Sequence, residues 1–235
     1  MPIGNTPGVL SNATADIALL LMLACSRKAM YMHNSIQQGD WGFFEPTANL
    51  GIDIRGKTLG IFGLGKIGYE LARRASAAFD MKIIYHNRGR HPEAERELGA
   101  RRVSFDDLLE NSDVLSVHTA LTPETRGRFN RDVFVRMKRT SIFINSARGA
   151  IHNEEDLTEA LRDGIIWGAG LDVTNPEPMR RTILCCLCLT FAYFRILVLL
   201  RKKQGQPCPC LPQKNIVAGL KGERLPFIVN PDVYA

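Results

Sequence analysis

A glycine-rich hexapeptide, Gly63–Gly68, constrains the fold of this chain more than any other feature of its sequence. It has the pattern GxGxxG, follows the apolar run Leu59–Phe62 and opens a segment with helical periodicity. In that context Gly63 suits a tight turn, Gly65 lets the backbone approach a pyrophosphate, and Gly68 lets the helix pack closely on the strand. The helix N-terminus would then face the anion with free N–H groups. The alternative is a strand–helix turn that binds no ligand.

The chain around this turn alternates between apolar strands and helical patterns from Lys57 to Met179. Such alternation predicts βαβ units, so we expect an α/β fold with a Rossmann-type, doubly wound parallel sheet. Asn153 is placed to cap the last helix of this region. The predicted strands are Thr58–Phe62, Lys82–His86, Val114–His118, Ser141–Asn145 and Gly168–Val173, and the predicted helices include Lys66–Phe79 and Glu154–Arg162.

The end of the second predicted strand bears on the choice of cofactor. A domain that binds NAD normally places a carboxylate there, which accepts a hydrogen bond from the ribose 2′-hydroxyl. Here Lys82–His86 is followed by Asn87–Arg90, which contains no Asp or Glu. A guanidinium in this place suits a 2′-phosphate, which predicts NADP as the preferred cofactor and NAD as the other candidate. The alternative is that Arg88 and Arg90 belong to a solvated loop.

Three segments precede the first strand. Pro2–Ser11 carries turn chemistry in its Asn-Thr-Pro-Gly tetrapeptide and predicts a short strand-and-turn fragment. Ala13–Met32 is apolar with few charges and predicts one long buried helix. Gly39–Gly56 is rich in glycine and proline and predicts a loop.

The segment of residues 180–213 differs from the rest of the chain. It has the period of neither a strand nor a helix, and it holds five of the six cysteines. Its apolar run Thr182–Leu200 is interrupted only by Arg195. We interpret the segment as foreign to the surrounding fold and expect an apolar helix rather than a strand of the sheet. The alternatives are a membrane-spanning helix and a metal site, although the cysteine spacing differs from that of zinc sites.

The net charge of +6 also arises in the C-terminal part of the chain. Residues 180–235 hold nine Lys and Arg against two Asp and Glu, whereas residues 1–179 hold 21 against 22. The basic excess therefore does not predict a surface that binds nucleic acid. The body of the chain has one cysteine, Cys25, which predicts no disulfide framework. Since this composition fits a reducing compartment, we expect a cytoplasmic protein.

Further motifs occur in order along the predicted strands: Ser116–Thr119 (SVHT), Ser146–Gly149 (SARG), Gly170–Val173 (GLDV) and Pro176–Pro178 (PEP). Together with the GxGxxG turn they resemble the D-isomer-specific 2-hydroxyacid dehydrogenases, and most closely the glyoxylate/hydroxypyruvate reductase branch. The likeness runs from about Pro2 to Met179 and resumes at Asn215–Gly222. It implies an NAD(P)H-dependent oxidoreductase that reduces a small 2-keto acid, such as glyoxylate or hydroxypyruvate, and a homodimer.

The resemblance implies roles residue by residue. Arg148 would bind the carboxylate and carbonyl of the 2-keto acid, a task that suits the fork of a guanidinium. Glu177 would hydrogen-bond a histidine and raise its pKa, so that the histidine donates a proton near neutral pH. Arg148 and Glu177 are thus the predicted catalytic residues. The predicted cofactor-binding residues are Thr14, Gly63, Gly65, Lys66, Ile67, Gly68, Asn87, Arg88, Thr119, Ala147 and Asp172.

The chain departs from the family where that histidine is expected. The family places it after the Pro-Glu-Pro motif, but no histidine occurs between Asn153 and Ala235. This departure raises an alternative function, a catalytically impaired dinucleotide-binding variant. The predicted organisation is a remnant of a substrate domain (1–11), a dinucleotide-binding domain (12–179), the foreign segment (180–213), and a C-terminal helix and tail (214–235) that is a second substrate-domain remnant.

Overall fold

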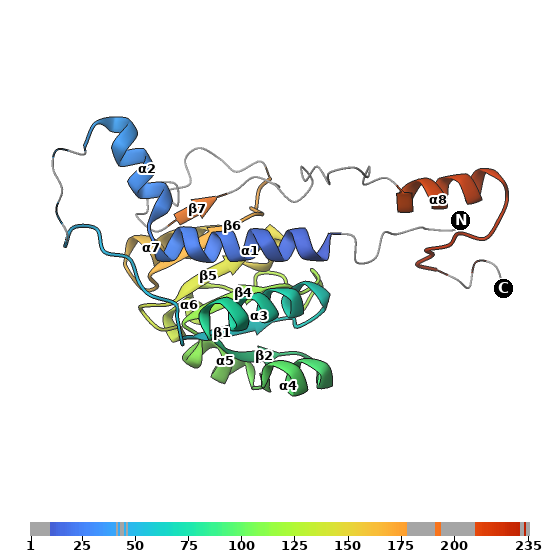
Figure 1. Cartoon of the computed structure of the whole chain (residues 1–235), viewed down its shortest axis with the longest axis horizontal. Coiled ribbons are helices and arrows are strands. Elements are labelled where there is room, and N and C mark those ends of the chain that lie inside the picture. The colour runs from blue at the N-terminus through green and yellow to red at the C-terminus, as the bar shows by residue number, and fades with distance from the viewer. Residues whose placement is uncertain are drawn as a thin grey trace.

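The computed structural model describes residues 10–40, 42, 45, 47–177, 191–193, 210–230 and 233, with residues 191–193 and 210–213 described by their backbone alone. A seven-stranded parallel sheet forms the centre of the described part, in the order β3-β2-β1-β4-β5-β6-β7 (Figure 1). This order confirms the predicted doubly wound sheet, because the chain moves outward in both directions from β1 and β4. The strands are β1 Thr58–Phe62, β2 Lys82–His86, β3 Arg101–Arg102, β4 Val114–Val117, β5 Ile142–Asn145, β6 Gly168–Leu171 and β7 Phe191–Tyr193.

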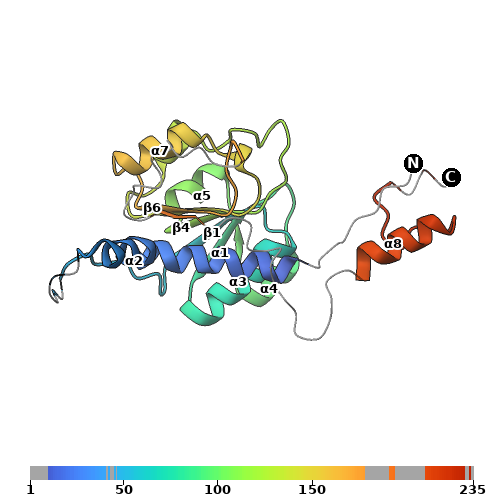
Figure 2. The ribbon, with the colours of Figure 1, turned by 90° about the horizontal axis from the view of Figure 1, so that it is seen from above.

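Helices cover both faces of the sheet, as Figure 2 shows: α1, α3 and α4 lie on one face, and α5 and α7 on the other. Each face buries its own apolar cluster, which explains why the central strands of the sheet are mainly apolar. The helices are α1 Ser11–Ser26, α2 Ala29–Gln38, α3 Lys66–Phe79, α4 Pro92–Leu98, α5 Phe105–Asn111, α6 Arg131–Arg136, α7 Glu154–Arg162 and α8 Cys210–Leu220, with a short 3₁₀ turn at Gly149–Ile151.

Helix α1 packs against the sheet at a glycine. A Cβ atom added to Gly170 of β6 would lie 2.8 Å from Cβ of Leu21 and 3.3 Å from Sγ of Cys25. The Cys25 thiol is buried and donates a hydrogen bond to the carbonyl of Ala169 at 3.1 Å. The absence of a side chain at Gly170 therefore allows the helix to lie directly on the strand.

Two sequence predictions about helices are wrong. The predicted helix Ala13–Met32 is two helices, because Lys28 adopts a left-handed conformation with φ of 54° between α1 and α2. The apolar helix expected over Thr182–Leu200 is contradicted at Phe191–Tyr193, which form β7 and pair in parallel with β6. Hydrogen bonding to the edge of β6, rather than the local sequence pattern, thus determines the structure of these three residues. The rest of that segment up to residue 209, like the fragment before Leu10, lies outside the described residues.

The loop predicted for Gly39–Gly56 contains no helix or strand at its described positions. Helices α3 and α7 have the predicted bounds, and Asn153 caps α7 by accepting hydrogen bonds from the backbone N–H groups of Glu155 and Asp156. Within the described ranges, no helix has the length and hydrophobicity needed to cross a membrane, and no cluster of His, Cys, Asp and Glu could hold a metal ion.

Candidate functional site

An open cleft of about 940 Å³ lies at the carboxyl ends of β1, β2 and β4. This is the edge of a doubly wound sheet at which ligands bind, because the strand order reverses between β1 and β4. The glycine-rich turn forms one side of the cleft and the residues after β4 form the other. The lining residues are Phe62, Gly63, Leu64, Gly65, His86, Asn87, Arg88, Gly89, Arg90, His91, His118, Thr119, Ala120, Thr122, Glu124, Thr125 and Arg128.

The glycine-rich turn has the geometry that the sequence predicts. Gly63 has a φ of 99°, and a Cβ atom there would lie 2.8 Å from the amide nitrogen of Thr119. Gly65 stands immediately before the first residue of α3, and a Cβ atom there would meet no atom within 4 Å. A Cβ atom on Gly68 would lie 3.0 Å from the Ile61 side chain. Gly63 and Gly68 are thus required by the protein's own packing, whereas the space at Gly65 is open to a ligand.

Asn87 fixes the glycine-rich turn to the end of β2. Its Oδ1 atom accepts a hydrogen bond from the amide of Leu64 at 2.7 Å, and its Nδ2 atom donates to the carbonyl of Leu64 at 3.0 Å. A carboxylate at this position could accept the first bond but could not donate the second. The amide side chain therefore holds the two walls of the cleft together.

Arginines surround the mouth of the cleft, and they differ in their partners. Arg90 forms an ion pair with Glu95, with 3.0 Å between Nε and Oε2. The Arg90 guanidinium and the Tyr85 hydroxyl hold the pKa of Glu95 below its usual range. Arg128 stacks on the ring of Phe105 at 4.3 Å from the ring centroid. Arg88 is exposed and makes no ion pair within the described part of the chain, so its guanidinium is accessible to an anion. A hydrogen bond from Thr122 and, to a smaller extent, the charge of Arg88 hold the pKa of Glu124, which also lines the cleft, below its usual range.

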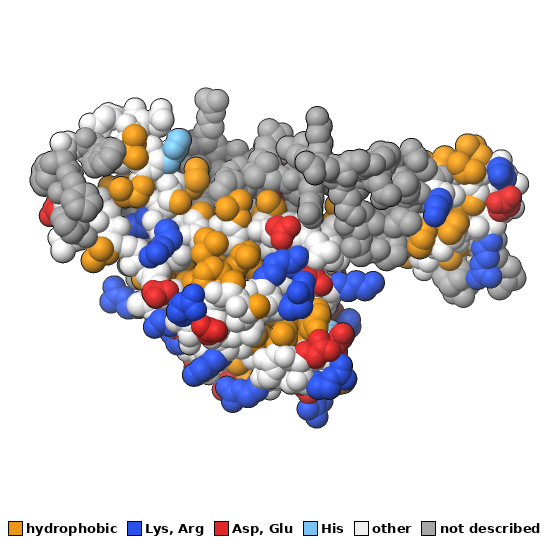
Figure 3. Space-filling view, in the orientation of Figure 1, with side chains coloured by type: hydrophobic (Ala, Val, Ile, Leu, Met, Phe, Trp, Pro, Cys, Tyr) orange, Lys and Arg blue, Asp and Glu red, His pale blue; other side chains and the backbone are white. Residues whose placement is uncertain are grey.

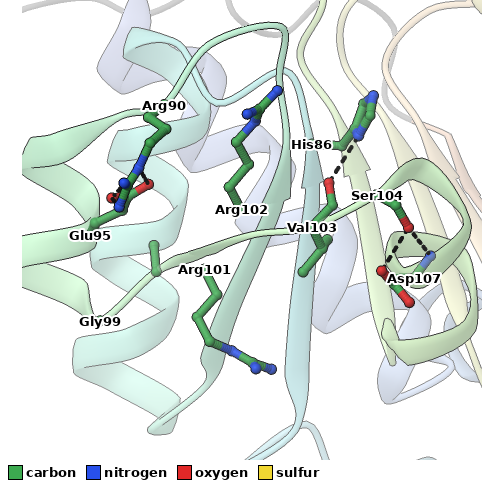
Figure 4. A pocket seen from close by; sticks show the side chains of 10 residues that line it. His86, Arg90, Glu95, Gly99, Arg101, Arg102, Val103, Ser104 and Asp107 are labelled. Atoms are coloured by element: carbon green, nitrogen blue, oxygen red, sulfur yellow. Dashed lines mark hydrogen bonds and ion pairs between the residues drawn. The ribbon is translucent and has the colours of Figure 1, made fainter.

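A second, shallower hollow of about 890 Å³ adjoins the cleft and shares His86 and Arg90 with it. Figure 4 shows this hollow, with the ion pair between Arg90 and Glu95 on one side and Ser104 and Asp107 on the other. Ser104 caps α5 by accepting a hydrogen bond from the amide of Asp107. Two pairs of the side chains that line the hollow, Arg90 with Glu95 and Ser104 with Asp107, therefore already bind one another.

His118 lies at the inner end of the cleft. Its Nε2 atom is 2.8 Å from the hydroxyl of Ser116, and its Nδ1 atom is 3.4 Å from the hydroxyl of Ser146. Burial lowers the pKa of His118 to about 4, because the imidazolium would lose its hydration without gaining a carboxylate partner. The ring is therefore neutral at physiological pH, with two hydroxyl neighbours that can each donate or accept a hydrogen bond.

The pKa of His118 predicts how stability depends on pH. The unfolded chain takes up a proton at this position below pH of about 6.5, whereas the folded chain does so only near pH 4. The stability linked to neutral His118 is therefore fully present above pH 6.5 and lost as the pH falls towards 4, by up to about 3 kcal/mol. Urea unfolding of the parent and of His118→Gln across this range measures the difference. Parallel pH profiles for the two proteins would contradict the prediction.

Arg148 lies on the loop that follows β5, and Asn145 shapes that loop. The Asn145 side chain accepts a hydrogen bond from the amide of Ala147 at 3.0 Å and donates to the carbonyl of Arg148 at 3.0 Å. The Arg148 side chain itself is exposed and donates only to the carbonyl of Ala147, within the described residues. The backbone of the loop is thus fixed, while the guanidinium faces solvent.

A buried Glu–His pair connects this loop to the loop that follows β6. Oε2 of Glu154 lies 2.9 Å from Nε2 of His152 and accepts a hydrogen bond from the amide of Asn175 at 3.1 Å. His152 in turn contacts Asn145 at 2.9 Å. The loops also touch directly, because a Cβ atom on Gly149 would lie 2.0 Å from the carbonyl oxygen of Thr174. Glu154 therefore sets the spacing between the two loops that carry Arg148 and Asp172.

The structure brings only some of the predicted site residues together. Gly63, Gly65, Asn87, Arg88 and Thr119 line the cleft. Lys66, Ile67 and Gly68 continue directly from it as the first turn of α3. Thr14 is buried in the first turn of α1, where its hydroxyl donates to the carbonyl of Leu10, and Asp172 is buried after β6. Ala147, Arg148 and the exposed Glu177 lie on the loops after β5 and β6, outside the lining of the cleft.

Sequence reasoning missed several residues of the site. Arg128 reaches the cleft from a loop that has no recognisable motif. In the sequence, Glu154 cannot be distinguished from the other acidic residues in the first turn of its helix. His118 lies within the SVHT motif, yet nothing in the sequence indicates that both its ring nitrogens face hydroxyl groups. These roles depend on contacts between segments that are distant in the chain.

Comparison with known proteins decides the family. The model of the D-isomer specific 2-hydroxyacid dehydrogenase NAD binding domain matches residues 19–187. The chain belongs to this family. A glyoxylate reductase of Thermococcus litoralis is 42% identical over 233 residues, which cover 97% of this chain and 70% of the relative. A glyoxylate/hydroxypyruvate reductase B of Salmonella gallinarum is 43% identical over 175 residues, 74% of this chain and 54% of the relative.

Solved structures of 2-hydroxyacid dehydrogenases agree with this result. The crystal structure of a glyoxylate reductase from Paecilomyes thermophila superimposes with a TM-score of 0.86 at 38% identity, covering 99% of this chain and 69% of that chain. The chain thus spans between about half and 70% of the length of its relatives. Its family is one of NAD-dependent oxidoreductases, and the comparisons do not support the alternative of a catalytically impaired variant.

Proposed function

We propose that this chain is an NAD(P)H-dependent reductase of a small 2-keto acid such as glyoxylate or hydroxypyruvate. The cleft at the glycine-rich turn carries the proposal, because its open space at Gly65 and the N-terminus of α3 suit a pyrophosphate. The residues that would hold the dinucleotide are Thr14, Gly63, Gly65, Lys66, Ile67, Gly68, Asn87, Arg88, Thr119, Ala147 and Asp172. The substrate class follows from the names of the relatives.

The chemistry assigned to this chain's own residues is binding and orientation. A bound dihydronicotinamide supplies the hydride that reduces the 2-keto carbon. Arg148 would bind the carboxylate and polarise the carbonyl of the keto acid, since a guanidinium can donate to both oxygens at once. Asn145 would keep the backbone of the Arg148 loop in place, and Glu154 would support it through His152. An external acid would protonate the substrate oxygen, and Glu177 keeps its proposed role as partner of such an acid.

The test is NADPH oxidation by the purified chain with glyoxylate, hydroxypyruvate and acetaldehyde. We expect oxidation above the substrate-free rate with both keto acids and none with acetaldehyde, which lacks the carboxylate that Arg148 would bind. Equal rates with all three compounds, or no oxidation with any of them, would contradict the proposal.

The preference for NADPH over NADH is a separate prediction, because it depends on Arg88. We expect NADPH to bind more tightly, and Arg88→Ala to remove most of that preference without abolishing NADH binding, since a phosphate gains more than a hydroxyl from a guanidinium. Arg139→Ala is the matched control, because Arg139 is an exposed arginine that donates to the carbonyl of Gly164 and does not line the cleft. Fluorescence titration measures the affinities. Equal affinities of the parent for the two cofactors would refute this preference.

We also propose that the chain forms a homodimer in the cytoplasm. Figure 3 shows apolar side chains gathered on the face that carries α1, and Leu20, Met32 and Ile36 of α1 and α2 are exposed. Contiguous exposed apolar side chains mark interaction surfaces. Sedimentation equilibrium is expected to give twice the chain mass, and Leu20→Glu is expected to shift it towards one chain mass. A parent protein with the mass of one chain would contradict the proposed dimer. Recovery of the chain in membrane pellets would contradict a cytoplasmic location.

A further inference from the structure

Arg102 holds the loop that carries Arg88. It lies on the edge strand β3, in register with Tyr85 of β2. Its Nε atom donates to the carbonyl of Asn87 at 3.1 Å, and its Nη2 atom donates to the carbonyls of Asn87 and Arg88 at 3.0 and 2.9 Å. The guanidinium therefore binds two consecutive carbonyl groups of the loop after β2.

The loop is also held at two other points. The Asn87 side chain binds both backbone groups of Leu64 in the glycine-rich turn. At the far end, Arg90 is paired with Glu95, which also accepts a hydrogen bond from the hydroxyl of Tyr85. Arg88 stands between these points with its side chain exposed at the cleft. Its backbone position, and hence where its guanidinium can reach, depends on the bonds from Arg102.

Arg102 itself is placed to position rather than to bind a ligand. It does not line the cleft at the glycine-rich turn but the neighbouring hollow, and Figure 4 shows Arg101 and Arg102 leaving β3 in opposite directions. Three of its N–H groups already point at backbone carbonyls. A planar guanidinium can bridge adjacent carbonyls in this way, whereas an ammonium group offers only a point charge.

We propose that Arg102 is a positioning residue for cofactor choice: by binding the carbonyls of Asn87 and Arg88 it aims Arg88 at the 2′-phosphate of NADPH. This inference rests on the proposed function, in which Arg88 contacts that phosphate. It predicts that removing Arg102 weakens recognition of the phosphate while leaving the rest of the dinucleotide site intact, because the bonds of the Asn87 side chain to Leu64, which hold the glycine-rich turn, do not involve Arg102.

The experiment uses calorimetric titration of the full chain with 2′,5′-ADP and 5′-AMP, which differ in the 2′-phosphate. The ratio of the two affinities is the readout, since a general loss of folding would lower both. We expect Arg102→Ala to reduce the parent's ratio roughly fivefold, the value of about one hydrogen bond, and Arg102→Lys to reduce it nearly as far although it keeps the charge. Arg101→Ala, on the same strand, is expected to keep the parent ratio.

Each outcome separates the two proposals. A parent that binds the two fragments equally would overturn NADPH preference itself. A parent that prefers 2′,5′-ADP and loses the preference in Arg88→Ala, but retains it in Arg102→Ala, would overturn only the role of Arg102. If Arg102→Lys kept the parent's ratio of affinities, the charge of Arg102 rather than its bonds to the two carbonyls would matter. That result would also overturn the positioning role of Arg102. If Arg102→Ala proves unfolded by circular dichroism, Arg102→Lys decides the question.

Discussion

Replacing Arg148 with alanine is expected to lower kcat/KM for glyoxylate reduction by roughly 100- to 1000-fold, the usual cost of losing a donor to a developing oxyanion. NADPH affinity is expected to stay within about twofold of the parent, because Arg148 does not line the cleft at the glycine-rich turn. The fold should be unaffected, since the exposed side chain makes only one hydrogen bond, to the carbonyl of its neighbour Ala147, among the described residues. Steady-state kinetics and a fluorescence titration measure the two quantities.

Two further variants make this result specific. Arg148→Lys keeps the charge but loses the fork, so it is expected to recover only part of the activity. Arg139→Ala removes another exposed arginine, whose contact is with the carbonyl of Gly164 far from the cleft, and should behave as the parent. Retention of parental kcat/KM in Arg148→Ala would mean that another group binds the keto acid.

Replacing Gly63 with alanine is expected to weaken dinucleotide binding roughly 10- to 100-fold and to lower the unfolding temperature. A residue with a side chain is strained by about 1–3 kcal/mol at an unfavourable φ, and Gly63 has a φ of 99°. The new Cβ atom would also lie 2.8 Å from the amide nitrogen of Thr119 and 2.9 Å from the carbonyl carbon of His118. These are backbone atoms, so the turn itself must move.

Gly65→Ala is the matched control for Gly63→Ala. A Cβ atom at Gly65 would meet nothing within 4 Å, so the unfolding temperature should stay close to that of the parent. Binding should still weaken, because the added methyl group would occupy the space left for the pyrophosphate. Thermal unfolding and NADPH titration of both variants separate the two effects. If Gly65→Ala bound NADPH as tightly as the parent, the phosphate would not approach this turn.

The sequence predicts the centre of the fold well because its strands are buried on both faces. Thr58–Phe62 and Lys82–His86 have the predicted bounds, since their apolar runs end at glycine, asparagine or charged residues. The break at Lys28 could not be predicted, because Lys28 adopts a left-handed φ of 54° although neither glycine nor proline marks the position. Strand β7 was missed for a related reason: pairing with the edge of β6, rather than local periodicity, determines its structure.

In the candidate site, too, features that are local in sequence could be predicted, and features that depend on contacts between distant segments could not. The glycine-rich turn is local in sequence, so its geometry follows from the motif and the flanking strand and helix. The second role of Asn87 does not follow from the motif, because its side chain binds both backbone groups of Leu64 in the turn. Arg102 and Glu154 act through carbonyls and amides of other segments. Such contacts exist only once the sheet has brought its carboxyl ends together.

The configuration of the glycerate formed from hydroxypyruvate tests the central claim most directly. The family is specific for D-isomers, and a bound dihydronicotinamide would deliver the hydride to one face of a keto acid held by Arg148. We expect the purified chain with NADPH to form D-glycerate alone, at a rate that falls in Arg148→Ala, as measured by chiral chromatography. Formation of L-glycerate or of both isomers, or no glycerate despite bound NADPH, would contradict the account.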